Sequence, residues 1–510
     1  MIDDNAHAVA AEAAPLYDIW RRALPNTATH SLVSAAIEAT RDVRRRPSNG
    51  KPPRNRKPAD QKMYDTLAHG VVCALVHRAL TLPGGWTRVP LAHQRAGGAA
   101  ASRYSSSGLT RSLPGFVRAL EDRGWLELVP GYLGRTERVQ SIMRSTPALV
   151  HEVQHRGCKL TDFTTDASQE LIVLKGRKPA GRDGRGRTFA APWIDYPDTS
   201  ETKRMRLDME EVNAWLASAP LDYIERGTGV DAIGDRRMRR VFNNGSFAEG
   251  GRLFGGFWLP MSMCAEKAKR RDTPWRAHIR IEGEPIVAVD FVSMFIRLLY
   301  AKAGVQPPSG DLFSGIEGLG PEHRVGVKKV MHALLFTDRG LSKLPRGTRV
   351  YLPKGIHVRT LLKSINRRHK PVAHLFSTGI GMTLFRLESD IMLEVLKGCR
   401  AENVWALPVH DAILVADSRA EDATRIMLAA FKAVTGFDAE VGEPKQPGID
   451  TPELDTMPEE MEDGEEDYFR VADLVKDGHR ELAGKLLIDC EADLAARRLP
   501  EAPTVEAEYR

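Results

Sequence analysis

A short apolar segment that ends in an acid constrains the fold of this chain more than any other feature. In IVAVD, four apolar residues lead into Asp290, as in a buried strand with a carboxylate at its end. About 120 residues later, LPVHDAILV places Asp411 between two apolar runs, as at the tip of a hairpin. A buried carboxylate is costly unless a cation lies beside it. On neighbouring strands, Asp290 and Asp411 would form a minimal cage for two magnesium ions, which is typical of nucleotidyl transfer.

The composition is that of a globular protein with more than one domain. Its 510 residues suffice for two or three domains, and 42% hydrophobic with 27% charged residues is an ordinary globular balance. The formal net charge of +6 mildly favours a polyanionic partner. The five cysteines are widely scattered without metal-ligand spacing, which argues against zinc and disulfides and favours a cytoplasmic location. No apolar run reaches the length of a membrane span, so no membrane partner is expected.

Composition shifts and loop signals divide the chain into five parts. The divisions fall at basic, proline- or glycine-rich stretches and before a strongly acidic stretch near the C-terminus. The predicted parts are a helix and basic linker (1–62), a small helix-and-strand domain (63–150), a connecting region (151–240), a large α/β domain (241–446), and an acidic linker with C-terminal helices (447–510).

The order of elements in 63–150 resembles a winged helix-turn-helix domain. Apolar residues at helical spacing predict helices at about 63–82 and 109–123, and the segments WLEL and VQSIMRSTP flank a turn-rich stretch, so we expect them to pair as a β-wing. The second helix would be the reading helix and would present Arg111 and Arg118 to duplex DNA. A module that contacts another protein, or has only a structural role, is the alternative.

Two further segments place cationic groups near the acids in sequence. In PEHRVGVKKVMHALLF, Arg324, Lys328 and His332 recur every four residues on a predicted helix, and interleaved valines indicate that the other face is packed. Such a basic stripe suits an anion such as a triphosphate, with a generic basic surface helix as the alternative. In GGRLFG, two glycines that allow close backbone approach precede Arg252; a turn with a surface arginine is the alternative.

In order and spacing, these segments resemble the polymerase core of family A DNA polymerases and, more distantly, the single-subunit phage RNA polymerases. GGRLFG is similar to the family's Thr-Gly-Arg-Leu-Ser-Ser element, IVAVDFVSMFIRLLY to motif A, HRVGVKKVMHALLF to motif B, and PVHDAILV to motif C, with LESDIMLEVL as the helix before it. The resemblance covers roughly 245–445. It implies an α/β (α+β) fold with a right-hand palm and a thumb-like part in 151–240. The short chain between motif B and the helix before motif C predicts reduced fingers, and no segment before residue 240 has the acid clusters of the family's proofreading exonuclease.

The resemblance also assigns roles at the reaction centre. Asp290 and Asp411 would hold two magnesium ions, or manganese in their place, and the backbone carbonyl of Phe291 would complete one ion's shell. Arg324 and Lys328 would clamp the triphosphate, and Lys328 would be the candidate to protonate pyrophosphate.

Further residues would contact the primer and the incoming nucleotide. The resemblance places His410 near the primer terminus, Arg252 in the minor groove, and His332, Phe336 and Phe295 at the nucleotide. Phe295 replaces a glutamate that helps the family exclude a 2′-hydroxyl, and Phe336 replaces a tyrosine whose hydroxyl helps phage RNA polymerases select ribonucleotides. The larger, apolar Phe295 should exclude the 2′-hydroxyl by volume, which predicts a preference for dNTPs; a core role for this ring is the alternative.

Departures from the family pattern leave the activity open. Ala412 stands where motif C has a glutamate that is usually helpful rather than essential. We expect a DNA polymerase that acts on a primer–template with dNTPs and serves a plasmid, phage or mobile element. Two alternatives remain: a non-catalytic DNA-binding replication or regulatory protein built on an inactive palm, and a primer-making enzyme that synthesises RNA with the same core.

Overall fold

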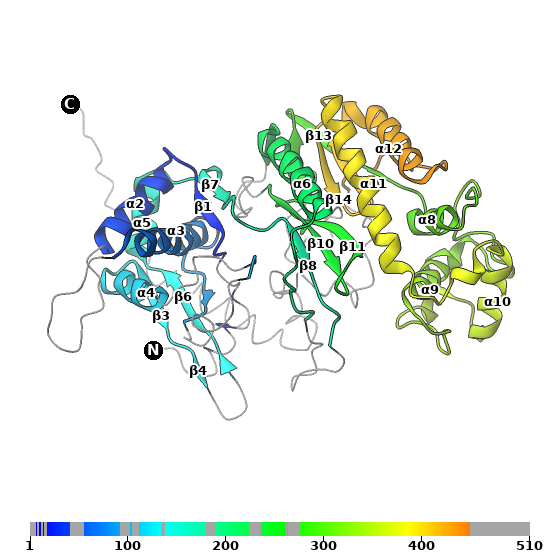
Figure 1. Cartoon of the computed structure of the whole chain (residues 1–510), viewed down its shortest axis with the longest axis horizontal. Coiled ribbons are helices and arrows are strands. Elements are labelled where there is room, and N and C mark those ends of the chain that lie inside the picture. The colour runs from blue at the N-terminus through cyan, green and yellow to red at the C-terminus, as the bar shows by residue number, and fades with distance from the viewer. Residues whose placement is uncertain are drawn as a thin grey trace, which may run out of the picture.

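Figure 1 shows the computed structural model of the chain, a mixed α/β structure. The structure describes residues 18–40, 56–91, 102–104, 112–133, 138–179, 190–223, 236–261, 263 and 276–448, with positions 7, 10, 11 and 14 near the N-terminus. The predicted C-terminal helices therefore lie outside the described residues. Within the described part, two large hydrophobic cores form, one on each side of residues 164–170.

The first core surrounds a small antiparallel sheet in the order β2 (Thr87–Val89), β6 (Ser141–Ser145), β3 (Leu126–Val129). Its register pairs Leu126 with Ser145 and Val129 with Ile142, which confirms the predicted pairing of WLEL with VQSIMRSTP. The short strands β4 (Tyr132–Leu133) and β5 (Arg138–Val139) extend this hairpin. Helices α3 (Pro58–Thr81), α4 (Leu113–Asp122) and α5 (Pro147–His155) contribute to the same core.

This first core is wider than the predicted 63–150 domain. Strand β1 (Arg21–Ala23) pairs with β7 (Phe163–Thr165), and helix α2 (Ala28–Thr40) packs on α3. Gly70 of α3 lets the chain just before β1 approach this helix closely, because a Cβ there would lie 3.1 Å from the backbone oxygen of Ile19. The folding unit therefore extends from about residue 18 to residue 166, and it takes in the first part of the predicted connecting region.

The second core contains a curled antiparallel sheet of five strands, in the order β14 (Ala406–Val409), β15 (Ala412–Ala416), β13 (Glu284–Asp290), β12 (Ile279–Ile281), β9 (Leu221–Tyr223). The four central apolar residues of β13 and every residue of β14 and β15 are buried, as their apolar sequences predict. Backbone groups of Lys445 and Ala288 exchange hydrogen bonds of 2.8 and 2.9 Å, so the chain after α12 (Ala420–Thr435) returns beside β13.

A second sheet of this core, with strands β8 (Ile172–Leu174), β10 (Met238–Asn243) and β11 (Ser246–Gly255), packs against the long helix α11 (Gly381–Ala401). Helix α6 (Ser200–Ser218) covers β8 and β10, as Figure 1 shows in green. Because β8 and α6 belong here, the predicted connecting region is divided between the two cores.

The remaining helices gather on one side of the second core, to the right of the lower half of α11 in Figure 1. They are α8 (Met294–Lys302), α9 (Arg324–Phe336) and α10 (Val358–Arg368). The helices that the sequence predicts around Lys328, before the second acid and after it are confirmed as α9, α11 and α12. No helix in the described ranges is long and apolar enough to cross a membrane.

Candidate functional site

Two strand ends bring the predicted acids together. Asp290 is the last residue of β13 and pairs with Ala412, the first residue of β15. Asp411 lies immediately before Ala412, in the two-residue turn that joins β14 to β15. That turn requires a left-handed backbone at His410, whose φ is 55°. The sequence prediction that these carboxylates are neighbours is therefore confirmed by the register of the sheet.

Burial makes this pair of acids electrostatically unfavourable without a cation. Asp411 is 1% exposed, and the side chain of Asp290 is 12% exposed. Among the described residues, Oδ1 of each carboxylate is buried and has no hydrogen-bond partner. Burial, and then the charge of Asp411, raises the pKa of Asp290 to about 8, and burial raises the pKa of Asp411 as well. Unsatisfied buried oxygens on two adjacent acids are the arrangement that a divalent metal relieves.

Two lysines face the acids. Lys445 Nζ lies 3.6 Å from Asp290 Oδ2, and both Lys328 and Lys445 lower the pKa of each acid. Burial lowers the pKa of Lys328 to about 8, although the neighbouring acids oppose the change. Sequence reasoning identified Lys328 by its helical spacing but missed Lys445, which reaches the site only because the chain after α12 returns beside β13.

Arg252 lies inside the protein rather than at an exposed groove. It is 6% exposed, and its Nη2 is 2.9 Å from Glu388 Oε2 on α11. A bulge in the β10–β11 hairpin and the left-handed Gly251 allow β11 to approach α11 this closely. The glycines before Arg252 therefore serve the packing of the hairpin, since a Cβ on Gly251 would lie 2.9 Å from the ring of Phe242. Contact between Arg252 and a minor groove stays a prediction that this structure does not favour.

The Arg252–Glu388 ion pair also influences the acids. Burial raises the pKa of Glu388 to about 7, and Arg252 opposes this change. Arg252 is also the charged group that most lowers the pKa of Asp411. Glu388 was not predicted from the sequence, where it is one polar residue in an amphipathic helix.

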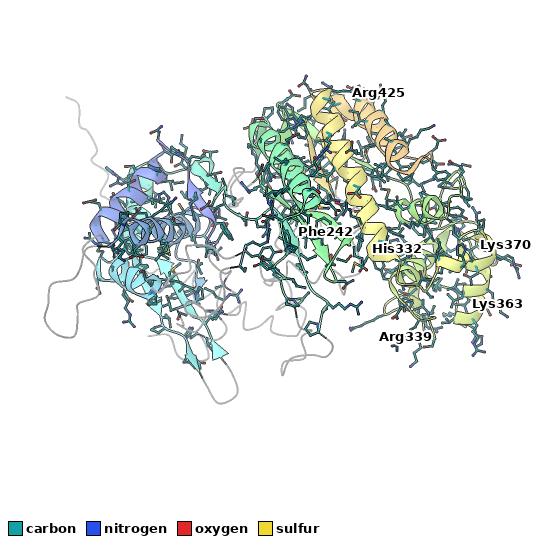
Figure 2. All side chains as sticks on the ribbon, in the orientation of Figure 1. Phe242, His332, Arg339, Lys363, Lys370 and Arg425 are labelled. Carbon is teal, nitrogen blue, oxygen red and sulfur yellow. The ribbon has the colours of Figure 1, made fainter. Side chains whose placement is uncertain are left out.

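The predicted nucleotide-contacting rings form a closed aromatic cluster. Phe295 is 3% exposed, and its ring centroid lies 5.2 Å from that of Phe385, 5.7 Å from that of His332 and 6.3 Å from that of Phe336. Figure 2 labels His332 at the junction of α9 and α11. Burial, followed by Lys328 and Arg252, lowers the pKa of His332 to about 3. His332 is therefore neutral, and the predicted basic stripe on α9 is reduced to Arg324 and Lys328.

Arg324 and Phe291 each have neighbours that the sequence did not indicate. Arg324 makes two hydrogen bonds to Asp311, of 2.8 and 3.0 Å, while its side chain is 43% exposed. Phe291 forms a bridge with Val441 in the returning chain. Neither arrangement tests the predicted contacts with a triphosphate or a metal ion.

The other predicted residues are placed as follows. Burial lowers the pKa of His410 well below its usual value, so this residue is a neutral neighbour of Asp411. Arg118 is exposed on α4, whereas Arg111 lies outside the described residues.

No group of three or more His, Cys, Asp or Glu gathers as a metal site in the part of the chain that the structure describes. No family model matches this chain, and no curated protein is significantly similar to it.

Proposed function

We propose that this chain is a template-directed nucleotidyltransferase that extends a DNA primer with dNTPs. The observation that carries the proposal is the pair Asp290 and Asp411, which lie at adjoining ends of β13 and β15 with one unsatisfied, buried oxygen each. Held by these carboxylates and the Phe291 carbonyl, two magnesium ions, or manganese ions, would activate the primer hydroxyl and neutralise the leaving pyrophosphate.

The residues around the acids support this chemistry. Lys328, whose pKa is lowered to about 8, can donate a proton near neutral pH to a leaving group beside it. Arg324 is partly exposed on the same helix and would clamp the triphosphate by exchanging its bonds to Asp311 for bonds to phosphate oxygens. The curled antiparallel sheet with α11 and α12 would serve as the palm, and α8 to α10 as reduced fingers.

The first core supports a second contact with DNA. Its sheet order β2–β6–β3, with α4 before β3 and a hairpin extension between β3 and β6, suits a winged helix-turn-helix domain. Arg118 is exposed on α4 and would bind the duplex near the primer–template. A polymerase core joined to such a domain suits the replication of a plasmid, phage or mobile element.

Primer extension by the full chain tests the proposal. Asp290→Asn and Asp411→Asn should each lower the rate about a thousandfold or more while DNA binding persists, because several kcal/mol of transition-state stabilisation disappear with a metal ligand. Asp438→Asn, at an exposed acid, is the control and should extend normally. Near-normal extension by either mutant would refute the assignment of the acids. Extension with rNTPs alone would instead support a primer-making enzyme, and no extension by the unmodified chain a non-catalytic DNA-binding protein.

A further inference from the structure

The segment 339–370 carries a high density of positive charge and no negative charge. It contains ten Lys and Arg and no Asp or Glu, although the net charge of all 510 residues is only +6. Nine of the ten side chains are exposed. Among the described residues, acidic partners are found for Arg339, with Asp338, and for Arg367, with Glu317. Like charges at this density repel one another, and a polyanion relieves the repulsion.

The same segment is hollowed into a groove. A cavity of about 920 Å³ is lined entirely by residues between Ser342 and Thr360, with Lys343, Arg349 and Arg359 on its wall. This volume is in the range of small-ligand sites, so the groove suits the backbone of a single strand better than a whole duplex.

Exposed apolar side chains lie beside these cations. Val350, on the wall of the groove, is 81% exposed, and the adjacent Tyr351 is 39% exposed. Lys329 Nζ lies 4.8 Å from the centroid of the Tyr351 ring, which holds the ring at the surface. Cationic grooves with an exposed aromatic ring are typical of proteins that bind single strands, because the ring offers a surface on which a base can stack.

The groove is attached to the candidate site through α9. The Leu352 side chain covers Gly326 of α9 so closely that a Cβ there would lie 2.6 Å away. On its other side, Leu361 and Ile365 of α10 are buried in the second core. Arg359 and Lys363 lie one turn apart on the exposed side of α10, and Figure 2 shows Lys363 and Lys370 extending outward from this end of the molecule. A strand in the groove would thus lie next to the helix that carries Lys328.

We propose that this groove binds the sugar–phosphate backbone of single-stranded nucleic acid, with Arg349 and Arg359 as phosphate contacts and Tyr351 as a stacking surface. The binding requires no catalysis, so the inference goes beyond the proposed function. Were the chain to extend primers, the strand held here would be the unpaired template next to the site.

The test measures how a labelled oligothymidylate of about 16 nucleotides binds to the full chain as salt is raised, by fluorescence anisotropy. Arg349→Gln/Arg359→Gln should lower the slope of log affinity against log salt by about 1.4, since each single-strand phosphate contact contributes about 0.7. Affinity should fall roughly tenfold at moderate salt. Lys203→Gln/Lys302→Gln removes the same charge from exposed positions on α6 and α8 and should change neither quantity.

Other results of these binding measurements would contradict the proposal or separate it from the proposed function. Equal slopes for the two double variants would overturn the proposal, provided that both unfold at the wild-type temperature. An equal loss of affinity for a duplex probe would overturn the single-strand assignment, because it would indicate a general polyanion surface. Asp290→Asn should retain the wild-type slope while it loses primer extension, so failure of the proposed function and failure of the groove can be told apart.

Discussion

Arg252 and Glu388 form an ion pair that is almost completely removed from water. We predict that Arg252→Met destabilises the protein by about 3–5 kcal/mol, because Glu388 is left buried without its cationic partner. Glu388→Gln should cost less, about 1–3 kcal/mol, because the amide can still accept a hydrogen bond from the guanidinium. Urea unfolding at neutral pH measures both free energies. Arg425→Met removes an exposed pair with Glu402 and is the control that should leave the unfolding midpoint nearly unchanged.

A substitution at Phe295 should change both the choice between dNTPs and rNTPs and the stability of the fold. We predict that the unmodified chain strongly prefers dNTPs and that shortening this ring relaxes the preference. Because the ring is enclosed by His332, Phe336 and Phe385, Phe295→Ala should also cost about 3–5 kcal/mol. Phe295→Leu is the better probe, since it keeps most of the volume. Steady-state incorporation of dNTPs and rNTPs gives the selectivity; an unchanged ratio in a folded variant would mean that the ring serves the core alone.

Among single residues, the sequence predicted those whose position follows from the pattern of apolar and charged residues around them. Asp290 and Asp411 were found because an acid after a buried apolar run stands out, and Lys328 because helical spacing aligns it with Arg324. The partners Glu388, Lys445 and Asp311 were not found, because each contact depends on which segments pack together. Arg252 shows the same limit, since a local Gly-Gly-Arg pattern does not reveal whether the side chain points to solvent or to α11.

Helix α10 is fastened to the second core at its C-terminal end by a buried histidine. His369 contacts the Leu312 backbone oxygen at 3.0 Å and Tyr300 Oη at 3.2 Å. Burial, and then Arg368, lowers the pKa of His369 to about 4. The folded state thus binds fewer protons than the unfolded state below pH 6.5. The stability that neutral His369 contributes is present above pH 6.5 and is lost as the pH falls towards 4.

The prediction is that His369→Gln destabilises the protein at pH 7 and that the difference from wild type shrinks at pH 4.5. On the order of 3 kcal/mol of pH-dependent stability would disappear with the imidazole, at 1.36 kcal/mol per pKa unit. Urea midpoints at the two pH values measure the difference. His374→Gln, at an exposed histidine seven residues before the start of α11, should follow the wild-type pH profile. A constant difference between the His369 variant and wild type would contradict the assignment.

The first core should bind duplex DNA when it is produced alone. We predict that a fragment of residues 18–166 binds a duplex with an affinity that falls steeply as salt rises, and that Arg118→Ala weakens this binding. The shorter 63–150 fragment should be unstable, because it lacks β1, α2 and β7. Lys159→Ala, at an exposed lysine outside α4, is the matched control. A folded 18–166 fragment that binds no duplex at low salt would indicate a protein-contact role.

Elements with a strong period of their own were predicted well. Helices α3, α9, α11 and α12 and the β14–β15 hairpin all follow local apolar patterns, and the pairing of β3 with β6 follows from the turn between them. Strands β1 and β7 were not predicted, since each has only three residues and they pair across about 140 positions of sequence. The width of the first core was missed for that reason, as was the assignment of β8 and α6 to the second core.

In the whole molecule, a side chain from the first half of the chain fastens onto the second core. Arg103 lies in the segment between β2 and α4, yet its guanidinium contacts Glu170 at 3.2 Å, Asp195 at 2.8 Å and Asp198 at 3.0 Å. The neighbouring Tyr104 donates a hydrogen bond to the Ile194 oxygen at 3.0 Å and accepts one from the Leu174 nitrogen at 2.9 Å. Residues 103 and 104, which come between β2 and α4 of the first core in the sequence, thus pack on the second core.

This connection predicts how the molecule unfolds. Arg103→Ala should separate the unfolding of the two cores into two calorimetric transitions, because the remaining covalent link transmits little of the stability of one core to the other. Arg206→Ala is the matched control, since Arg206 pairs with Glu170 and Asp198 from within the second core. It should lower the transition of that core without separating the two further. Identical profiles for the two variants would show that Arg103 does not couple the cores. Arg103→Ala should also lower the affinity of the full chain for a primer–template that carries a long duplex. Each core would then bind its part of the DNA independently, and the gain in affinity from simultaneous binding would be lost.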